Sequence, residues 1–131
     1  MTDRITLVKK AYEAMQYSYS PYSGFKVGAA LLCKSGKVYT GCNIENAAFS
    51  PTNCAERTAF FKAVSEGEKE FTAIAIVGGK NGEITDFCYP CGVCRQVMAE
   101  FCGADFEIIT ANQESIKTYT LKELLPQSFK I

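Results

Sequence analysis

The chain has 131 residues, of which 47% are hydrophobic and 21% are charged, and its fourteen basic side chains balance its fourteen acidic ones. This length and composition are typical of one globular domain with its own core, here residues 1–131. The missing basic excess argues against a nucleic-acid partner, and no apolar run approaches the roughly 20 residues of a membrane span.

Hydrophobic periodicity predicts helices and strands along the whole chain. Leu7 and Ala11 fall on one helical face, behind a cap at Thr2 or Asp3. Residues 71–77 form a nearly continuous apolar run, as in strands buried on both faces. The expected elements are a helix over 3–17, strands over 27–33 and 38–43, a helix over 54–66, a strand over 71–77, a helix over 91–102, strands over 106–111 and 116–119, and a short helix between Thr120 and Pro126.

The order of these elements predicts an α/β fold. Helices that separate most of the strands must pack on both faces of a single mixed sheet. In such sheets, ligand sites lie where strands hand over to helices. Residues 78–89 read as an unusually long loop. We expect this loop to stay clear of the residues that carry the chemistry.

The cysteine count favours metal or redox chemistry. There are seven cysteines, an odd number, and Cys91 and Cys94 have Cys-x-x-Cys spacing. The first residues do not read as a secretion signal, because no charged stretch leads into an apolar one. In such a chain, metal binding or redox use is more natural than a disulfide framework. We therefore expect a cytoplasmic protein.

The chemistry is concentrated in two short motifs, Cys54-Ala55-Glu56 and Pro90-Cys91-Gly92-Val93-Cys94. They offer three thiolates and one carboxylate that is not needed as a ligand. A catalytic zinc site keeps three protein ligands and leaves the fourth position to water, whereas a structural site is closed with four. The pattern is the known signature of zinc-dependent nucleobase deaminases, in its all-cysteine variant. It predicts one zinc ion per chain, although the spacing does not exclude other soft metals.

Both motifs lie at predicted helix starts, where free backbone N–H groups favour thiolate over thiol. Three thiolates leave a zinc site with a net negative charge, which opposes ionisation of a water. We expect Arg57 to hydrogen-bond a ligand sulfur and withdraw charge from it. Glu56, two residues beyond a ligand, is the candidate catalytic acid and base. That task requires a pKa near neutrality.

The chain resembles the cytidine deaminase family, in its short all-cysteine form, over nearly its whole length. The likeness rests on the order and spacing of several motifs rather than on any single one. These are Ser20-Pro21-Tyr22-Ser23 with Phe25, Val27-Gly28-Ala29-Ala30, the run from Gly41 to Ala47, the run from Cys54 to Ala59, the run from Pro90 to Gln96, and Leu124-Leu125-Pro126.

The resemblance implies hydrolysis of cytidine and 2′-deoxycytidine to uridine and 2′-deoxyuridine in pyrimidine salvage. It implies a three-layer α/β/α sandwich around a five-stranded mixed sheet. It also implies a homotetramer with active sites near subunit interfaces. By matched position, Cys54, Cys91 and Cys94 bind zinc, Glu56 shuttles protons, Asn43 and Glu45 bind the ribose 3′-hydroxyl, Phe25 packs against the substrate, the Ala55 backbone faces the pyrimidine edge, and Phe129 closes a neighbour's site.

The Asn43 and Glu45 pair suits a nucleoside substrate. A sugar hydroxyl can donate to the carboxylate and accept from the amide, and a site built on such bonds rejects analogues that lack the group. The Glu45 carboxylate would also repel a phosphate, which favours nucleosides over nucleotides.

The residues alone leave structural interpretations open. Asn53 and Glu56 have the spacing of a capping box, in which Glu56 would serve only to cap a helix. Arg95 is either a solvated helix residue or an interface group. Cys88 forms an evenly spaced trio with Cys91 and Cys94, but Pro90 favours the last two as ligands.

Three other functions compete with the main interpretation. A structural zinc module would use Cys54, Cys91, Cys94 and a fourth thiol such as Cys88, since the chain has no histidine. A thiol redox protein would use only the Cys-x-x-Cys pair. Among deaminases, blasticidin-type aminonucleoside deaminases share both cysteine motifs, and the pair at Asn43 and Glu45 favours the plain nucleoside over them.

Overall fold

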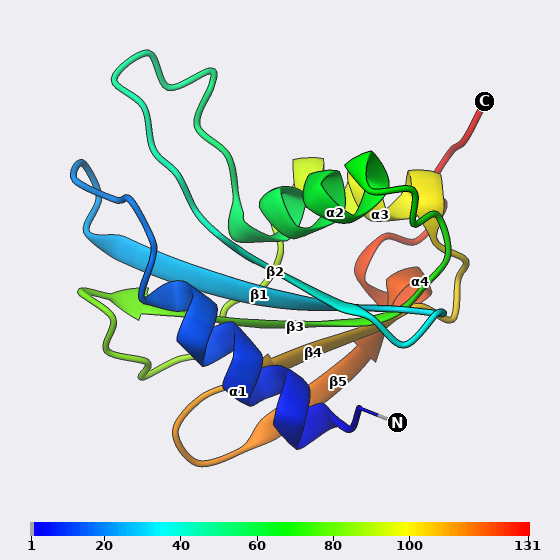
Figure 1. Cartoon of the computed structure of the whole chain (residues 1–131), viewed down its shortest axis with the longest axis horizontal. Coiled ribbons are helices and arrows are strands. Elements are labelled where there is room, and N and C mark those ends of the chain that lie inside the picture. The colour runs from blue at the N-terminus through cyan, green and yellow to red at the C-terminus, as the bar shows by residue number, and fades with distance from the viewer. Residues whose placement is uncertain (1) are drawn as a thin grey trace.

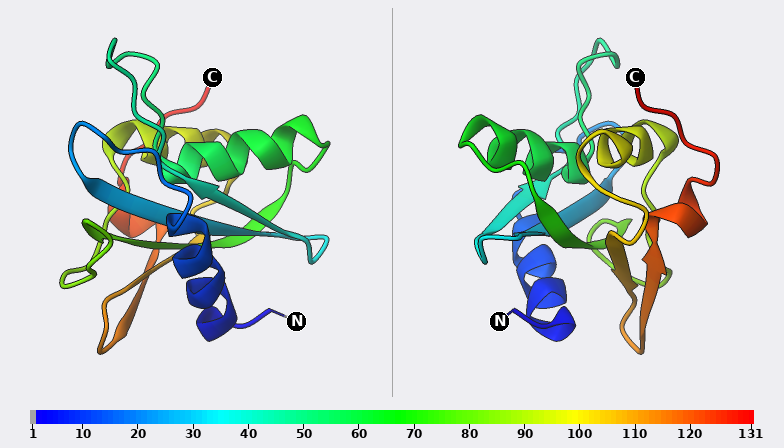
Figure 2. Two further views of the ribbon diagram at one scale, coloured as in Figure 1. Left: turned by 60° about the vertical axis from the view of Figure 1, so that its left-hand side comes forward. Right: turned by 90° about the vertical axis from the view of Figure 1, so that its right-hand side faces the viewer.

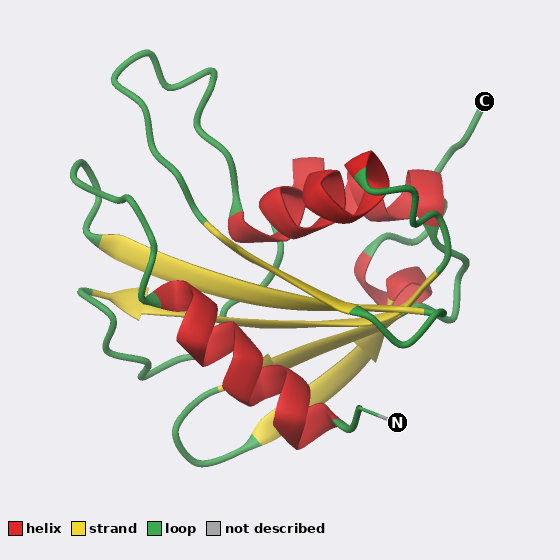
Figure 3. Ribbon diagram, viewed as in Figure 1, coloured by secondary structure: helices red, strands yellow, loops and turns green. Residues whose placement is uncertain are grey.

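The computed structural model describes residues 2–131 and contains a five-stranded sheet with helices on both faces (Figures 1 and 3). Its elements are α1 (Arg4–Met15), β1 (Phe25–Cys33), β2 (Val38–Cys42), α2 (Ala55–Ser65), β3 (Phe71–Lys80), α3 (Gly92–Phe101), β4 (Glu107–Ala111), β5 (Ile116–Thr120) and α4 (Leu121–Leu124). None of the helices in this described part of the chain is long and apolar enough to cross a membrane.

The sheet is mixed, with the strand order β2-β1-β3-β4-β5. Strands β3 and β4 are parallel, and the other three neighbouring pairs are antiparallel. A parallel pair needs a crossover connection, and α3 lies within it. The segment before α3 therefore leaves the sheet at the carboxyl end of β3.

The helices form two layers, with α1 on one face of the sheet and α2, α3 and α4 on the other (Figure 2). The expected α/β/α sandwich around a five-stranded mixed sheet is confirmed. The α1 face contains Leu7, Val8, Ala11 and Met15 packed against Ala30, Leu32, Ala73, Ala75, Val77, Ile109 and Ala111. On the other face, Phe60 of α2 is 1% exposed and contacts the rings of Phe71 and Phe106. Full burial of such a side chain contributes about 1.5–3 kcal/mol.

Most helix ends follow the expected signals. Asp3 caps α1, and its side chain accepts a hydrogen bond of 2.8 Å from the Thr6 N–H. Gly67 follows α2 with a φ of 98°, a conformation that glycine adopts without steric cost. Thr120 and Glu123 form a complete capping box at α4, as predicted.

Two glycines let helices approach the sheet at backbone distance. A Cβ atom on Gly28 would lie 2.0 Å from the Ala11 carbonyl oxygen in α1. A Cβ on Gly41 would lie 2.4 Å from the Ala55 carbonyl oxygen at the start of α2. Any larger residue would push these helices away. The first turn of α2 is therefore set directly against β2.

Strands β1 and β3 are longer than predicted. They pair antiparallel from Phe25 opposite Lys80 onward, so the prediction of a loop from residue 78 is wrong for residues 78–80. Gly78 and Gly79 are typical of a loop when the sequence is considered alone, because it does not show which residues lie next to them in space. In the structure, a Cβ on Gly79 would lie 1.9 Å from the Glu83 carbonyl oxygen, so this glycine permits a close chain crossing.

We predict that Gly28→Ala destabilises the fold by about 1–3 kcal/mol or more, because the added methyl meets backbone that cannot rotate away. Urea denaturation measures the change in the free energy of unfolding. Gly103→Ala is the matched control, since a Cβ there meets nothing within 4 Å. Equal stability of the two variants would contradict the close approach of α1.

Candidate active site

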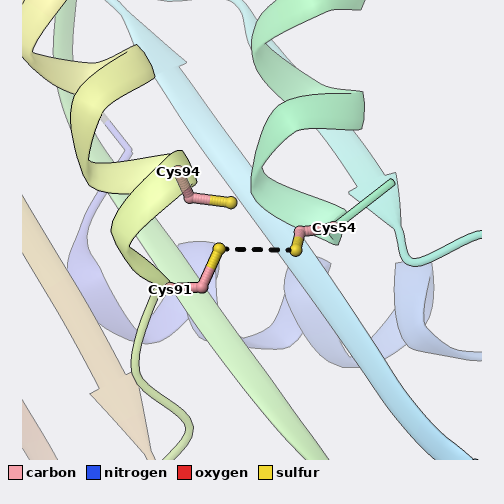
Figure 4. Close-up of side chains that lie close together, drawn as sticks. All are labelled: Cys54, Cys91 and Cys94. Carbon is pink, nitrogen blue, oxygen red and sulfur yellow. Dashed lines mark hydrogen bonds between the residues drawn. The ribbon is translucent and has the colours of Figure 1, made fainter. Parts of the chain in front are cut away.

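Three cysteine sulfurs converge where two helices begin (Figure 4). Cys54 is the N-cap residue of α2, Cys91 is the N-cap residue of α3, and Cys94 lies in the first turn of α3. All three Sγ atoms lie within 4.8 Å of one another, and those of Cys54 and Cys91 are 3.7 Å apart. The structure therefore brings together the three thiols that the motifs singled out.

The sulfur cluster fits a zinc ion. A tetrahedral zinc with Zn–S bonds of about 2.3 Å holds its sulfurs about 3.8 Å apart, close to the separation of Cys54 and Cys91. Among the described residues, these three cysteines are the one group of thiol and carboxylate side chains close enough to share a metal. Cys88 stands outside the group, in agreement with the preference for Cys91 and Cys94.

Arg57 contacts the sulfur cluster from the first turn of α2. Its guanidinium Nη2 donates to the Cys54 sulfur over 3.3 Å, which is the contact expected from sequence. The neighbouring Cys94 thiol and the Arg57 guanidinium both stabilise the Cys54 thiolate, so the pKa of Cys54 lies below that of an ordinary thiol. A positive charge beside the ligands offsets part of their negative charge.

Glu56 is buried beside the cluster, with 4% of its surface exposed. Burial raises the pKa of its carboxyl to about 7, and the charge on Cys54 acts in the same direction. A cation held by the three sulfurs would lower this pKa, because positive charge favours the carboxylate. A carboxyl that titrates near neutrality can both accept and donate a proton.

The capping-box interpretation of Glu56 is wrong. The N-cap residue of α2 is Cys54 rather than Asn53, which places Glu56 at the second helical position. The Asn53 N–H donates to the Ile44 carbonyl, and its side-chain amide donates to Thr58. No cap contact therefore occupies the Glu56 carboxyl.

A cleft of about 300 Å³ opens beside the cluster. Cys54, Glu56 and Cys91 line this cleft, and so does every substrate-binding residue expected from the resemblance except Phe129. Those four residues are Phe25, Asn43, Glu45 and Ala55. Ile44 and Asn53 hydrogen-bond each other through their backbones, and this bridge ties the Asn43–Glu45 segment to the residue before Cys54.

Asn43 is held firmly and retains little free bonding capacity. Its side-chain oxygen accepts from the Val27 N–H at 2.9 Å and from the Ser18 hydroxyl. Its amide nitrogen donates to the Phe25 carbonyl at 2.8 Å. An amide nitrogen has two donors, so one remains for a ligand. The residue is 9% exposed, at the wall of the cleft.

Glu45 is oriented by the turn that precedes β1. One carboxylate oxygen accepts from the N–H groups of Tyr22 and Ser23, at 3.0 and 3.1 Å, and the other accepts from the Ser23 hydroxyl. These bonds, led by the hydroxyl, hold the pKa of Glu45 below its usual range. The carboxylate is thus ionised and fixed at the cleft.

Sequence reasoning missed several residues that shape the site. Ser18 and Ser23 orient the two polar residues above. Ser23 belongs to a motif that carries the resemblance, but the sequence assigned neither serine a role in the site. Cys88 and Tyr89 line the cleft, so the expectation that the loop stays clear of the chemistry is wrong. No local signal identifies them, because only the folding of that loop against the sheet brings them to the cleft.

Two further residues lie outside the cleft. Arg95 is half-buried rather than a simple solvated helix residue: its guanidinium donates to the carbonyls of Pro90 and Leu124, at 2.8 and 2.6 Å, and a role at an interface stays a prediction. It thereby braces the turn before Cys91. Phe129 is 69% exposed and does not line this cleft, so its role toward a neighbouring subunit stays a prediction.

A sequence model of the family described as "Cytidine and deoxycytidylate deaminase zinc-binding region" matches residues 1–110. The chain belongs to this deaminase family. The resemblance drawn from the motifs is confirmed, and with it the expectation of an enzyme that deaminates cytidine.

Individual relatives agree with the family assignment. The chain is 52% identical over 128 residues to a cytidine deaminase of Halalkalibacterium halodurans, a match that covers 97% of this chain and 94% of that protein. The crystal structure of cytidine deaminase from Burkholderia pseudomallei superposes with a TM-score of 0.90 at 44% identity, covering 98% of this chain and 100% of that one. A blasticidin-S deaminase of Bacillus cereus is more distant, at 32% identity over 129 residues, covering 95% of this chain and 91% of that protein.

We predict that Arg57→Gln weakens metal retention about 10–100-fold, the usual effect of losing a partner of a metal ligand. Competition with a chelator, followed by metal content per chain, measures this effect. Lys62→Gln, an exposed change on the same helix, is the control. Unchanged metal affinity together with unchanged turnover would refute the assigned role.

Proposed function

We propose that residues 1–131 form a single cytidine deaminase domain that hydrolyses cytidine and 2′-deoxycytidine to uridine and 2′-deoxyuridine, with release of ammonia. The observation that carries the proposal is the buried Glu56 carboxyl beside three thiols, in the same cleft as a polar pair suited to a sugar. Neither a structural metal site nor a dithiol redox site has a use for that carboxyl.

One zinc ion per chain, held by Cys54, Cys91 and Cys94, completes the proposed site. When bound, the ion supplies Lewis acidity that makes a water acidic enough to react near neutral pH. Arg57 lowers the electron density on the Cys54 sulfur through its hydrogen bond. The three sulfurs then oppose this acidity less than three unpaired thiolates would.

Glu56 moves the protons of the proposed reaction. Its carboxylate takes one proton from the water whose oxygen attacks C4 of the pyrimidine, and passes it to N3. It next takes the second proton from the added oxygen and gives it to the amino group, which leaves as ammonia while the C4 carbonyl forms. One carboxylate can serve both transfers because burial raises its pKa from the ordinary carboxyl range toward neutrality, and this opposes the lowering by a bound cation.

The remaining cleft residues orient the nucleoside. Asn43 has one N–H to give and Glu45 has a fixed carboxylate, so together they donate to and accept from the ribose 3′-hydroxyl. Phe25 packs against the substrate, and the backbone at Ala55 faces the pyrimidine edge. Both lie in the same cleft, which supports these roles.

We further infer that the enzyme is a cytoplasmic homotetramer of pyrimidine salvage, with active sites near subunit interfaces and no nucleic-acid partner. The exposed Phe129 ring, outside its own cleft, supports a contact with a neighbour's site. The balanced net charge supports a small nucleoside rather than a polynucleotide as substrate.

We predict that Glu56→Gln keeps its zinc and lowers kcat for cytidine by about 10²–10⁴-fold or more, because the amide cannot transfer protons. An ultraviolet assay with cytidine, deoxycytidine, their monophosphates and adenosine, run beside a zinc count per chain, measures both effects. Glu100→Gln, an exposed change on α3, is the control.

The same experiment separates the competing functions. A structural zinc module would lose nothing on Glu56→Gln, and a redox protein would hold no zinc. An aminonucleoside deaminase of the blasticidin type would leave cytidine unchanged. If the wild-type protein removes the amino group from none of the test compounds, the proposed function is wrong.

We predict that Glu45→Gln lowers kcat/KM for cytidine about 10–100-fold, the usual effect of weakening a hydrogen bond to a charged group. The loss should largely vanish with 3′-deoxycytidine, which lacks the hydroxyl that Glu45 binds. Glu13→Gln, on the exposed side of α1, is the control. An equal loss on both nucleosides would show that Glu45 does not contact the 3′-hydroxyl.

A further inference from the structure

The segment before Cys91 is fastened to the edge strand β5 by two pairs of side chains. The Lys117 ammonium lies 4.3 Å from the centroid of the Phe87 ring. The rings of Tyr89 and Tyr119 meet edge to face, with centroids 5.8 Å apart and hydroxyls 3.3 Å apart. Alternate residues of the segment therefore contact alternate residues of the strand.

These contacts lie on the face of the sheet that carries the metal site. Tyr119 pairs in register with Ile108, and Ile108 belongs to the core beneath α2 and α3. The Phe87–Tyr89 segment covers β5 on that face. The Lys117–Phe87 and Tyr89–Tyr119 contacts thus fix the distance of this segment from the sheet, beside the cleft.

Cys88 lies between the two anchored residues and faces the cleft together with Tyr89. It is backed by the sheet, because a Cβ on Gly78 would come within 3.1 Å of its sulfur. Burial raises the pKa of the Cys88 thiol to about 12, so this part of the wall is uncharged. A wall with solid backing cannot retreat from a larger ligand.

The proposed function fixes which edge of the pyrimidine meets this wall. C4 points to the thiol cluster, and N1, on the opposite side of the ring, carries the ribose toward Asn43 and Glu45. Glu56 and Ala55, both on α2, occupy the N3 edge. The C5 edge is left for the other lining segments, and C5 neighbours C4. Among these segments, Cys88 and Tyr89 directly precede Pro90 and Cys91 in the sequence, and Cys91 is one of the thiols toward which C4 points. This segment is therefore the one we place beside C5.

We propose that Cys88 and Tyr89 form the wall that faces C5 of the pyrimidine and thereby set which 5-substituted cytidines the enzyme accepts. The inference rests on the proposed function, since it uses the orientation of the bound nucleoside. Phe87, Lys117 and Tyr119 act as positioning residues that hold the wall in place.

The test compares kcat/KM for cytidine with that for 5-fluoro-, 5-methyl- and 5-bromocytidine. Cys88→Val adds bulk to the wall and should lower the ratio for 5-methylcytidine to cytidine about 10-fold or more, the effect of one carbon too many in a tight pocket. Cys88→Ala and Tyr89→Ala remove bulk and should raise the ratio for the larger substituents. Cys102→Val, a half-buried cysteine outside the cleft, is the matched control.

Binding supplies a second readout that does not require turnover. Calorimetry with uridine and 5-methyluridine should give the same order of preference among the variants. Zinc content and thermal unfolding identify any variant that fails to fold, and the two alanine variants then decide. Ratios within about twofold of wild type in every folded variant would overturn the inference. Failure of the wild-type enzyme to deaminate cytidine would instead overturn the proposed function.

Discussion

The convergence of two helix starts is the constraint on which the site depends. Cys54 and Cys91 are the N-cap residues of α2 and α3, and the two helices lie on the same face of the sheet. Each helix is fixed by other parts of the fold, α2 by the backbone contact at Gly41 and α3 by the brace from Arg95 to Pro90 and Leu124. The distance between the sulfurs is therefore a property of the whole α/β/α arrangement, and Glu56 and Arg57 inherit their positions from it.

The motif residues could be predicted from sequence because their chemistry fixes their local spacing. Two thiolates three residues apart on one helix lie on the same face and can bind the same zinc ion. A carboxylate two residues after Cys54 lies in the first turn of the helix that Cys54 caps, beside the same metal site. Hydrophobic periodicity predicted the helices and strands, their order predicted a mixed sheet with helices on both faces, and the family resemblance implied five strands. Within each motif and each element, the residues that carry the pattern lie within one turn or one strand of each other.

The features that could not be predicted depend on contacts far along the chain. Ser18 hydrogen-bonds Asn43, and Ser23 hydrogen-bonds Glu45, across more than twenty residues. Gly79 looks like a loop residue until its pairing with Lys26 of β1 shows that it is part of β3. The N-cap residue of α2 is Cys54 rather than Asn53, because the backbone of Asn53 is paired with Ile44. In each case a distant partner decided what a local pattern left ambiguous.

The caps of α2 and α3 have a consequence for folding. Neither the Cys54 nor the Cys91 side chain accepts a capping hydrogen bond from a backbone N–H of its own helix, whereas those of Asp3 and Thr120 do so at α1 and α4. A good polar cap stabilises a helix by about 0.5–2 kcal/mol, so two helices in this chain begin without that support. Ligand bonds from the same two residues would tie both helix starts together. Metal binding would then be linked to the stability of these two first turns.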